Sequence, residues 1–357
     1  MMKWAIFATA GMLAVGSLGA KPVPVYTHGE AGYPCIRTPS LVQTASGTLL
    51  AFAGSRCGKG DGCEPVVPFK QLSHQDAVLK RSSDGGATWS AISVLNVTDC
   101  TNRNHGSAVW DGRTNATIFV YNAGGLHWMR SIDDGTSWSA ARPIDLGNHS
   151  VARVAPGRGI QLRSTNPAAP GRILFVAQLE TNSGDVIFFT DDGGQSWSES
   201  DAVIPGCNEA QIAELPNGTL LFNARDETSV PKGGRKFALS HDGGKTWVVL
   251  RALVHSFGGD NCMGSMAMPL ANGPVYFSHP FNGGVRANGT IFVSGGGDSI
   301  TFGPYAGVED GAGNGFAYSC MHELAADSSL GLLFETGDAE CTPQSASCRI
   351  MYTTVAA

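Results

Sequence analysis

Short apolar runs recur along the chain, and turn-forming residues separate them. The clearest runs lie at 76–79, 117–121, 173–177, 186–190, 219–223 and 290–294. These runs are short, and most are rich in β-branched and aromatic residues, which is typical of strands rather than helices. The pattern therefore predicts an all-β fold built from many short strands.

One turn sequence recurs among these runs and reads Ser/Thr-x-Asp-x-Gly-x-Ser/Thr-Trp. Its copies occupy 82–89, 131–138, 190–197 and 240–247, and a worn fifth copy runs from Ser294 through Asp298 to Phe302. The spacing of about fifty residues fits a four-stranded propeller blade. Glycine permits a tight hairpin, the Asp and Ser/Thr side chains bond the backbone of their own turn, and the Trp ring anchors the turn. We therefore expect a structural role for the repeated aspartates.

The composition argues against several classes of function. Of the 357 residues, 47 are glycine and only 15% are charged, which suits short strands and tight turns. With a formal net charge of −6, no basic patch points to nucleic acid or to an acidic membrane surface. No spacing of cysteine and histidine is typical of a zinc site, so we expect neither a metal nor a cofactor.

The N-terminal residues predict a signal peptide. Lys3 precedes an apolar stretch at 4–15, and small residues follow at 17–20. The apolar stretch is too short to span a bilayer, although a buried first strand is an alternative. We therefore expect a signal peptide over 1–20, a single catalytic domain over 21–357, and a secreted, extracellular protein.

Cysteines and glycosylation sequons agree with secretion. Cys57 and Cys63 bracket one loop and Cys341 and Cys348 another, so each pair is expected to close a short disulfide loop. Nine cysteines leave at least one thiol over, and the sequence does not fix the pairing. Sequons begin at Asn96, Asn115, Asn148, Asn217 and Asn288.

Several segments carry a resemblance to a known family. They are YPCIRTPSL at 33–41, LLAFAGSR at 49–56, GRGIQL at 157–162, NEAQIAEL at 208–215, LLFNAR at 220–225, AYS at 317–319 and GLLFE at 331–335. In this order, and together with the Asp-containing turns known as Asp boxes, the chain resembles exo-α-sialidases. Thr38 stands where isoleucine is usual. The resemblance implies a six-bladed β-propeller with four-stranded antiparallel blades, which hydrolyses terminal α-linked sialic acids with retention of configuration.

The resemblance also implies a group of arginines that binds the substrate. Arg37, Arg225 and Arg286 would form the triad, and Arg56 would contact the carboxylate or a ring hydroxyl. Sialic acid carries a carboxylate on its anomeric carbon, and guanidinium groups stay charged and bond carboxylate oxygens through parallel donors. Arg286 is assigned by order and spacing alone.

The same resemblance assigns Tyr318 as nucleophile and Glu209 as its base. Sialidases are the tyrosine exception among retaining glycosidases, and a phenol needs a base because it is protonated at neutral pH. The acid/base is expected to be Asp61, with Asp76 as the alternative. Trp110 either lines an apolar wall for the acyl group or lies in the core.

Three other functions remain open from the sequence. An inactive sialoglycan-binding propeller would keep the arginines without a working acid, and a trans-sialidase would pass the sugar to another glycan. An Asp-box glycosidase for neutral sugars has no need for an arginine triad. The expected partners are sialylated glycans, as N-acetylneuraminic acid, its glycolyl form or the deaminated form Kdn. We expect no nucleic acid, no membrane span and a monomer.

Overall fold

The structure of the protein is a computed structural model. It describes residues 20–57, 72–100, 105–229, 234–250, 261–268, 272–281, 285–308, 315–325, 328–337 and 349–357. The expected signal peptide lies outside these residues except for Ala20. No helix within the described ranges is long and apolar enough to cross a membrane.

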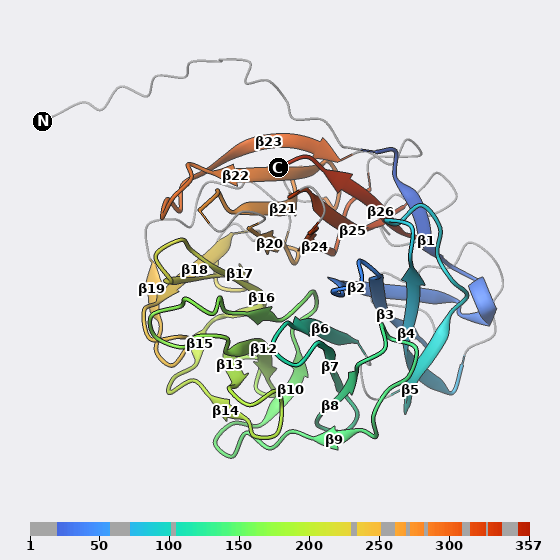
Figure 1. The fold of residues 1–357 in the computed structure, drawn as a ribbon, viewed down its shortest axis with the longest axis horizontal. Helices are drawn as coiled ribbons and strands as arrows, with labels where there is room; N and C mark the ends of the chain where they lie inside the picture. Colours follow the sequence, from blue (N-terminus) through green and yellow to red (C-terminus); the bar gives the residue numbers. More distant parts are fainter. Residues whose placement is uncertain are drawn as a thin grey trace, which may run out of the picture.

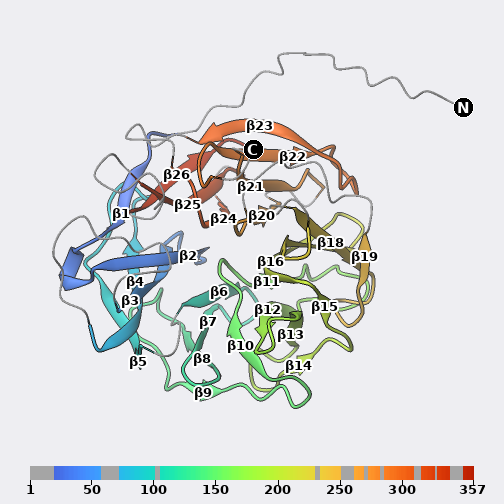
Figure 2. The ribbon, with the colours of Figure 1, turned by 180° about the vertical axis from the view of Figure 1, so that it is seen from behind.

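Six antiparallel sheets surround a central axis, and the chain visits them in sequence order (Figure 1; Figure 2). Blade 1 contains β2 (Cys35–Gln43), β3 (Leu49–Arg56), β4 (His74–Ser82) and β5 (Ser93–Asp99). Blade 2 contains β6 (Gly106–Asp111), β7 (Ala116–Asn122), β8 (Leu126–Ser131) and β9 (Arg142–Pro143). Blade 3 contains β10 (Val151–Val154), β12 (Ile173–Leu179), β13 (Gly184–Thr190) and β14 (Ser198–Glu199), with β11 (Ile160–Gln161) and β15 (Ile204–Pro205) as short additions.

The remaining blades follow the same plan. Blade 4 contains β16 (Cys207–Glu214), β17 (Leu220–Asp226), β18 (Arg235–Ser240) and β19 (Val248–Leu250). Blade 5 contains β20 (Ser265–Ala267), β21 (Tyr276–Pro280), β22 (Gly289–Ser294) and β23 (Phe302–Val308). Blade 6 contains β24 (Ser319–Glu323), β25 (Leu330–Thr336), β26 (Arg349–Val355) and, from the other end of the chain, β1 (Val23–Thr27). A 3-10 turn, η1 (Glu30–Gly32), follows β1. The prediction of a six-bladed all-β propeller is therefore confirmed.

Both ends of the chain meet in blade 6, where β1 pairs antiparallel with β26. The phenol of Tyr26 in β1 donates a hydrogen bond to the carbonyl of Ala51 in blade 1, at 2.6 Å. Adjacent blades also pack through apolar faces; the rings of Phe52 in blade 1 and Phe119 in blade 2 stack with centroids 4.8 Å apart. The ring of blades is thus closed by strand pairing and by packing.

The Asp-box turns have the predicted structural role. In the first copy, Asp84 Oδ1 accepts a hydrogen bond from the Thr88 N–H at 2.9 Å, and Trp89 Nε1 donates to the Gly86 carbonyl at 3.1 Å. The aspartates of the next three copies, Asp133, Asp192 and Asp242, make equivalent bonds. In the worn fifth copy, Asp298 instead accepts from the backbone of Asn217 in the neighbouring blade, at 3.1 Å.

The disulfide expected between Cys57 and Cys63 is wrong. Cys57 pairs with Cys100, because the ends of β3 and β5 bring their Cα atoms to 5.9 Å. Cys35 is disulfide-bonded as well. The free thiols among the described residues are the buried Cys207, Cys262 and Cys320, and the pair Cys341 and Cys348 lies outside those residues.

Candidate active site

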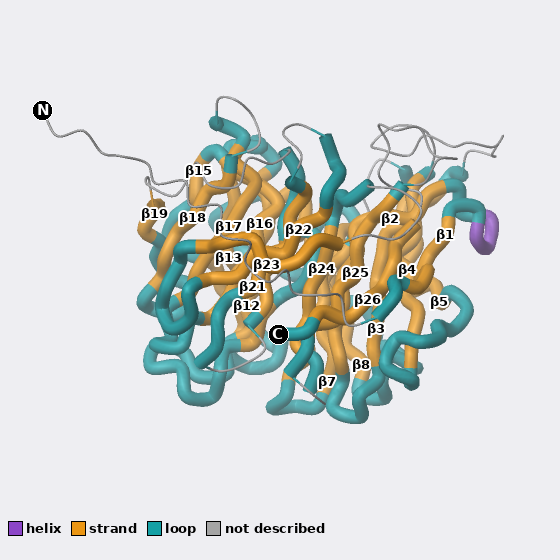
Figure 3. Tube along the Cα trace, turned by 90° about the horizontal axis from the view of Figure 1, so that it is seen from above, coloured by secondary structure: helices purple, strands orange, loops and turns teal. Residues whose placement is uncertain are grey.

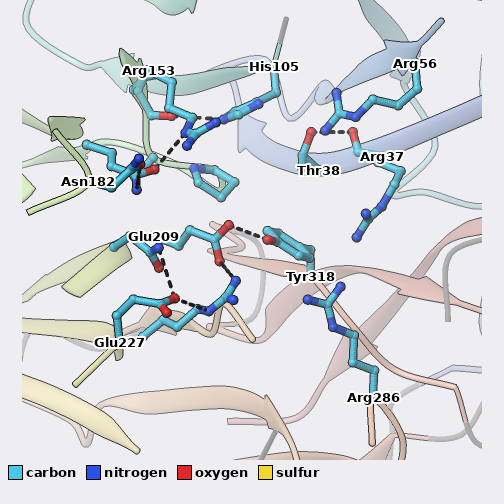
Figure 4. Close-up of a pocket in the computed structure, with 16 residues that line it drawn as sticks. Arg37, Thr38, Arg56, His105, Arg153, Asn182, Glu209, Glu227, Arg286 and Tyr318 are labelled. Carbon is cyan, nitrogen blue, oxygen red and sulfur yellow. Dashed lines mark hydrogen bonds and ion pairs between the residues drawn. The ribbon is translucent and has the colours of Figure 1, made fainter. Parts of the chain in front are cut away.

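A cavity of about 430 Å³ opens at one end of the central axis, where the innermost strands of the blades begin. It is lined by Arg37, Thr38, Arg56, His105, Arg153, Val154, Ala155, Pro156, Gln178, Asn182, Asn208, Glu209, Arg225, Glu227, Arg286 and Tyr318. Figure 3 shows that loops join the strands at both ends of the propeller. The cavity brings together all the predicted substrate-binding arginines, together with Glu209 and Tyr318 (Figure 4).

Arg37 is fixed by a buried carboxylate that the sequence analysis did not single out. Its Nε and Nη2 donate to Glu335 at 3.2 and 2.8 Å, and Glu335 is fully buried. Glu335 also accepts from the Thr38 N–H at 2.7 Å and approaches the Tyr318 N–H at 3.4 Å. One carboxylate therefore holds the arginine and orders the backbone beside the tyrosine. In the sequence, Glu335 is indicated only as the last residue of the family-like segment at 331–335.

Two β-bulges turn active-site residues toward the cavity. The register of β2 shifts between Arg37 and Ser40, and Thr38 has a φ of 61°. The register of β16 shifts between Asn208 and Gln211, and Glu209 has a φ of 53°. Positive φ strains a residue with a side chain, and such strain is typical of functional sites.

Glu209 joins the tyrosine to an arginine. Tyr318 Oη donates to Glu209 Oε1, and Arg225 Nη1 donates to Glu209 Oε2 at 3.0 Å. Burial raises the pKa of Tyr318 well above its ordinary value, and the nearby Glu209 carboxylate raises it further. The phenol is therefore protonated at neutral pH, and Glu209 is the acceptor placed to take its proton.

Two guanidinium groups lie close to the Tyr318 ring. The Cζ atoms of Arg37 and Arg286 are 5.1 and 5.4 Å from the ring centroid. The acidic groups around Arg286, first the Cys262 thiol and then Tyr318 and Glu335, raise the pKa of that arginine. Arg286 is thus charged at any ordinary pH, beside the phenol.

Arg225 is held by several partners besides Glu209. Its Nε donates to Asn261 Oδ1 at 2.7 Å and pairs with Glu227 Oε1 at 2.8 Å. Asn208 Nδ2 donates to the same Glu227 oxygen at 3.1 Å. These contacts fix the plane of the Arg225 guanidinium group. No motif in the sequence predicted that Glu227 or Asn261 would contact it.

The two candidates for the acid/base lie in different settings. Asp61 lies outside the described residues. Asp76, in β4, is buried, accepts a hydrogen bond from the Tyr33 phenol, and is not among the residues that line the cavity. Arg56 ends β3 and does line the cavity.

The wall formed by blade 3 is polar. Arg153 Nε donates to Gln178 Oε1 at 2.7 Å, and Gln178 Nε2 donates to Asn182 Oδ1 at 3.0 Å. The suggestion that Trp110 forms an apolar wall of this site is wrong, because Trp110 lines a different cavity. No motif joins Arg153, Gln178 and Asn182 in the sequence, so this polar wall was not predicted.

The second cavity, of about 370 Å³, lies at the other end of the axis and includes Trp110. Arg158 Nη2 bonds Glu323 Oε1 at 2.6 Å, and Arg163 pairs with Glu214 at 3.3 Å. Within the described part of the chain, no group of three or more His, Cys, Asp or Glu side chains is arranged to hold a metal ion.

Comparisons with known proteins agree with this architecture. Residues 119–321 match a family described as a BNR repeat-like domain. A sialidase of Bacteroides fragilis is 28% identical over 90% of this chain and 64% of its own length. A sialidase of Micromonospora viridifaciens is 32% identical over 67% of this chain and 41% of its own length. The chain thus spans less than two thirds of each of these relatives.

Solved structures share the fold. The Hadza microbial sialidase Hz136 superposes with a TM-score of 0.73 at 22% identity, over 94% of this chain and 68% of that one. The intramolecular trans-sialidase of Ruminococcus gnavus gives 0.70 at 17% identity, over 93% and 96%. With six blades, four of which carry an Asp-box turn, and a family match over more than half of its length, the chain belongs to the BNR repeat-like sialidase family.

Proposed function

We propose that the protein is an exo-sialidase that releases terminal α-linked sialic acids from glycans with retention of configuration. The observation that carries the proposal is the hydrogen bond from Tyr318 Oη to Glu209 beside the guanidinium groups of Arg37 and Arg286. A tyrosine nucleophile distinguishes sialidases from most retaining glycosidases.

The charge of the cavity supports an anionic substrate. Five arginines line it, against two glutamates, Glu209 and Glu227. Arginine bonds a carboxylate through two parallel donors and stays charged at any ordinary pH. A sialic acid carboxylate bound by Arg37, Arg225 and Arg286 would bring the anomeric carbon close to Tyr318 Oη.

Hydrolysis would then proceed in two chemical steps. In the first, Tyr318 Oη bonds to the anomeric carbon, its proton passes to Glu209, and the bond to the leaving oxygen breaks as the acid/base protonates that oxygen. In the second, water bonds to the anomeric carbon as the bond from that carbon to Tyr318 Oη breaks. The acid/base takes a proton from the water, and Glu209 returns its proton to Tyr318 Oη. The product is the free sugar with its original configuration.

A neutral phenol suits this substrate for an electrostatic reason. An anionic nucleophile would be repelled by the substrate carboxylate on the carbon that it attacks. Burial and Glu209 both raise the pKa of Tyr318, which keeps the phenol neutral until the reaction begins. As Glu209 takes the proton, the nearby Arg37 and Arg286 stabilise the charge that develops on the oxygen.

We assign the acid/base role to Asp61. It follows Arg56, which lines the cavity, by five residues in the sequence. The alternative, Asp76, is engaged by the Tyr33 phenol and by a weaker contact with His74 Nε2 at 3.7 Å. Asp61→Asn is expected to lower hydrolysis while leaving inhibitor binding intact, and Asp76→Asn is the matched control.

Hydrolysis of fluorogenic sialosides tests the proposal. Matched glycosides of N-acetylneuraminic acid, N-glycolylneuraminic acid and Kdn are given to the wild type and to Tyr318→Phe, and the anomer released first is followed by NMR. We expect release of the α anomer by the wild type alone. If the folded protein hydrolyses none of the three sialosides, the result would favour a binding module. Transfer of the sugar to added lactose would favour a trans-sialidase.

We also propose that the protein is secreted and acts as a monomer outside the cell. The Cys57–Cys100 disulfide supports this location, because disulfides persist mainly in oxidising compartments. Detection of the protein in the medium of expressing cells, with a cleaved N-terminus and the mass of one chain, is the expected result.

A further inference from the structure

A second carboxyl group lies buried behind the proposed base. Asp185 occupies the second position of β13 and has no exposed surface. Neither of its carboxyl oxygens makes a hydrogen bond of normal geometry. Buried carboxyl groups in folded proteins are nearly always satisfied, so an exception requires an explanation.

Asp185 lies in a row that begins at the cavity wall. Across blade 3, Arg153 of β10 pairs with Gln178 of β12, and Gln178 pairs with Asp185 of β13. Cross-strand partners project on the same face of a sheet. Arg153 and Gln178 line the cavity, so Asp185 is the next residue of this row behind the wall.

The other side of Asp185 faces blade 4, at the bulge of Glu209. The Glu209 carboxylate acts on Asp185 through its charge, and the Ala210 N–H points toward the Asp185 carboxyl. Two further groups face Asp185, the Arg153 guanidinium from β10 and the Cys207 thiol from β16. The carboxyl therefore lies between the polar wall and the strained residue that carries the base.

The balance of these neighbours favours the uncharged acid. Burial is the largest effect and raises the pKa of Asp185 well above its ordinary value, and Glu209 raises it further. The Ala210 N–H and Arg153 lower it by less. An ionised Asp185 would be a second buried negative charge beside Glu209, with no donor bonded to it in normal geometry.

We propose that Asp185 is a positioning residue for Glu209, held as a neutral carboxylic acid that supports the bulge at Glu209 and Ala210. The inference rests on the proposed function, because it assigns Glu209 the role of base. A neutral acid fills the space beside the Ala210 N–H without adding a second negative charge next to Glu209.

This role implies a stability cost that depends on pH. The pKa of Asp185 is higher in the folded protein than in the unfolded chain, so the folded state binds more protons once the pH exceeds the unfolded value. Stability contributed by the protonated group is complete below 3.8, the ordinary pKa of an aspartate, and falls as pH rises above it. A residue that stays neutral at this position does not lose stability in this way as the pH rises.

The test uses Asp185→Asn, which keeps the shape of the neutral acid, and Asp185→Ala, which removes it. We expect Asp185→Asn to unfold about 5 °C or more above the wild type at pH 7, with the gain vanishing toward pH 4. The matched control is Asp111→Asn. Asp111 is equally buried but is satisfied by Thr114, Gln161 and the Arg113 N–H, so its replacement should lower the unfolding temperature at pH 7.

Kinetics separate positioning from a purely structural role. Asp185→Asn is expected to keep kcat within about threefold of the wild type, and Asp185→Ala to lose more than about tenfold in kcat with little change in KM. The binding of 2,3-didehydro-2-deoxy-N-acetylneuraminic acid checks that the cavity of each variant is intact.

Two results would overturn the inference. One is an Asp185→Asn variant that is less stable than the wild type at pH 7, and the other is loss of kcat in Asp185→Asn as large as in Asp185→Ala. The unfolding measurement needs no substrate and stands even if Asp185→Ala does not fold. A wild type that hydrolyses no sialoside would instead count against the proposed function.

Discussion

The two ends of the central axis contrast in how they balance charge. The cavity of the candidate active site is lined by Arg37, Arg56, Arg153, Arg225 and Arg286 against Glu209 and Glu227. The opposite cavity is lined by Arg158 and Arg163 against Glu214 and Glu323, each arginine bonded to one carboxylate. The lining of the active-site cavity thus contains more arginines than carboxylates, whereas the lining of the opposite cavity contains equal numbers of the two.

The backbone of the innermost strands β2 and β16 also differs between the two ends of the axis. Both β2 and β16 have a bulge and a residue of positive φ, Thr38 and Glu209, near the active-site end. Toward the other end, the same strands pair in regular register through Gln43 and Glu214. In these two strands, the residues of positive φ therefore lie at the end that holds the candidate active site.

Turnover should differ most between the two cavities when the nucleophile is removed from one and a lining residue is substituted in the other. Tyr318→Phe should abolish nearly all turnover, because no other group can bond to the anomeric carbon from that position. Trp110→Phe, at the opposite cavity, is the control and should leave kcat near the wild-type value. Hydrolysis of a fluorogenic sialoside measures both, and turnover by Tyr318→Phe equal to the wild type would refute the mechanism.

Removal of the base is the next largest effect. Glu209→Gln keeps the size of the side chain but cannot take the phenol proton, so kcat should fall by about 10²–10⁴-fold. Glu323→Gln at the opposite end is the matched control. An equal loss in both variants would mean that the two ends do not differ in catalytic role.

Loss of an arginine from each cavity tests the difference in their linings. Arg225→Ala should weaken the binding of a sialic-acid-like inhibitor by about tenfold to a hundredfold, since a charged hydrogen bond contributes about 1.5–3 kcal/mol. Arg163→Ala removes a guanidinium that lines the opposite cavity and should change inhibitor affinity little. Calorimetric titration compares the two, and unchanged binding by Arg225→Ala would remove it from the triad.

The smallest effect concerns the Asp boxes, whose turns follow the third strand of a blade. Hydrogen bonds from Ser137 and Ser131 lower the pKa of Asp133 to about 2. The stability that this carboxylate adds is present above its unfolded pKa of 3.8 and lost as pH falls toward 2. Asp133→Asn should therefore lower the unfolding temperature at pH 7 by an amount that shrinks between pH 4 and pH 2, without changing kcat.

Local motifs were sufficient to predict the kind of blade, whereas the number of six blades was implied by the resemblance. The Asp-box turns, such as the one around Asp84, are made by residues adjacent in sequence, so their hydrogen bonds follow directly from the motif. The alternation of short apolar runs and turns likewise predicted the strands. Resemblance then identified Arg37, Arg56, Glu209, Arg225, Arg286 and Tyr318, which the structure brings to one cavity.

Contacts between residues far apart in the sequence could not be predicted from these local motifs. Cys57 lies nearer in sequence to Cys63 but bonds Cys100, because the order of strands in blade 1 decides which ends meet. Trp110 was considered for the active site, yet it lies near the far end of β6 and so belongs to the opposite cavity.

The sequence by itself determined the kind of blade through its Asp-box turns, and its resemblance to sialidases implied six blades and named six of the residues that line the cavity, since these depend on short segments. Only the tertiary structure decided which charges are neutralised. Glu335 reaches Arg37 across 298 positions of the chain, and the unsatisfied Asp185 lies behind Glu209 through the contact of two blades. The physical reason is that burial and ion pairing depend on distances in space, which the closure of the propeller sets.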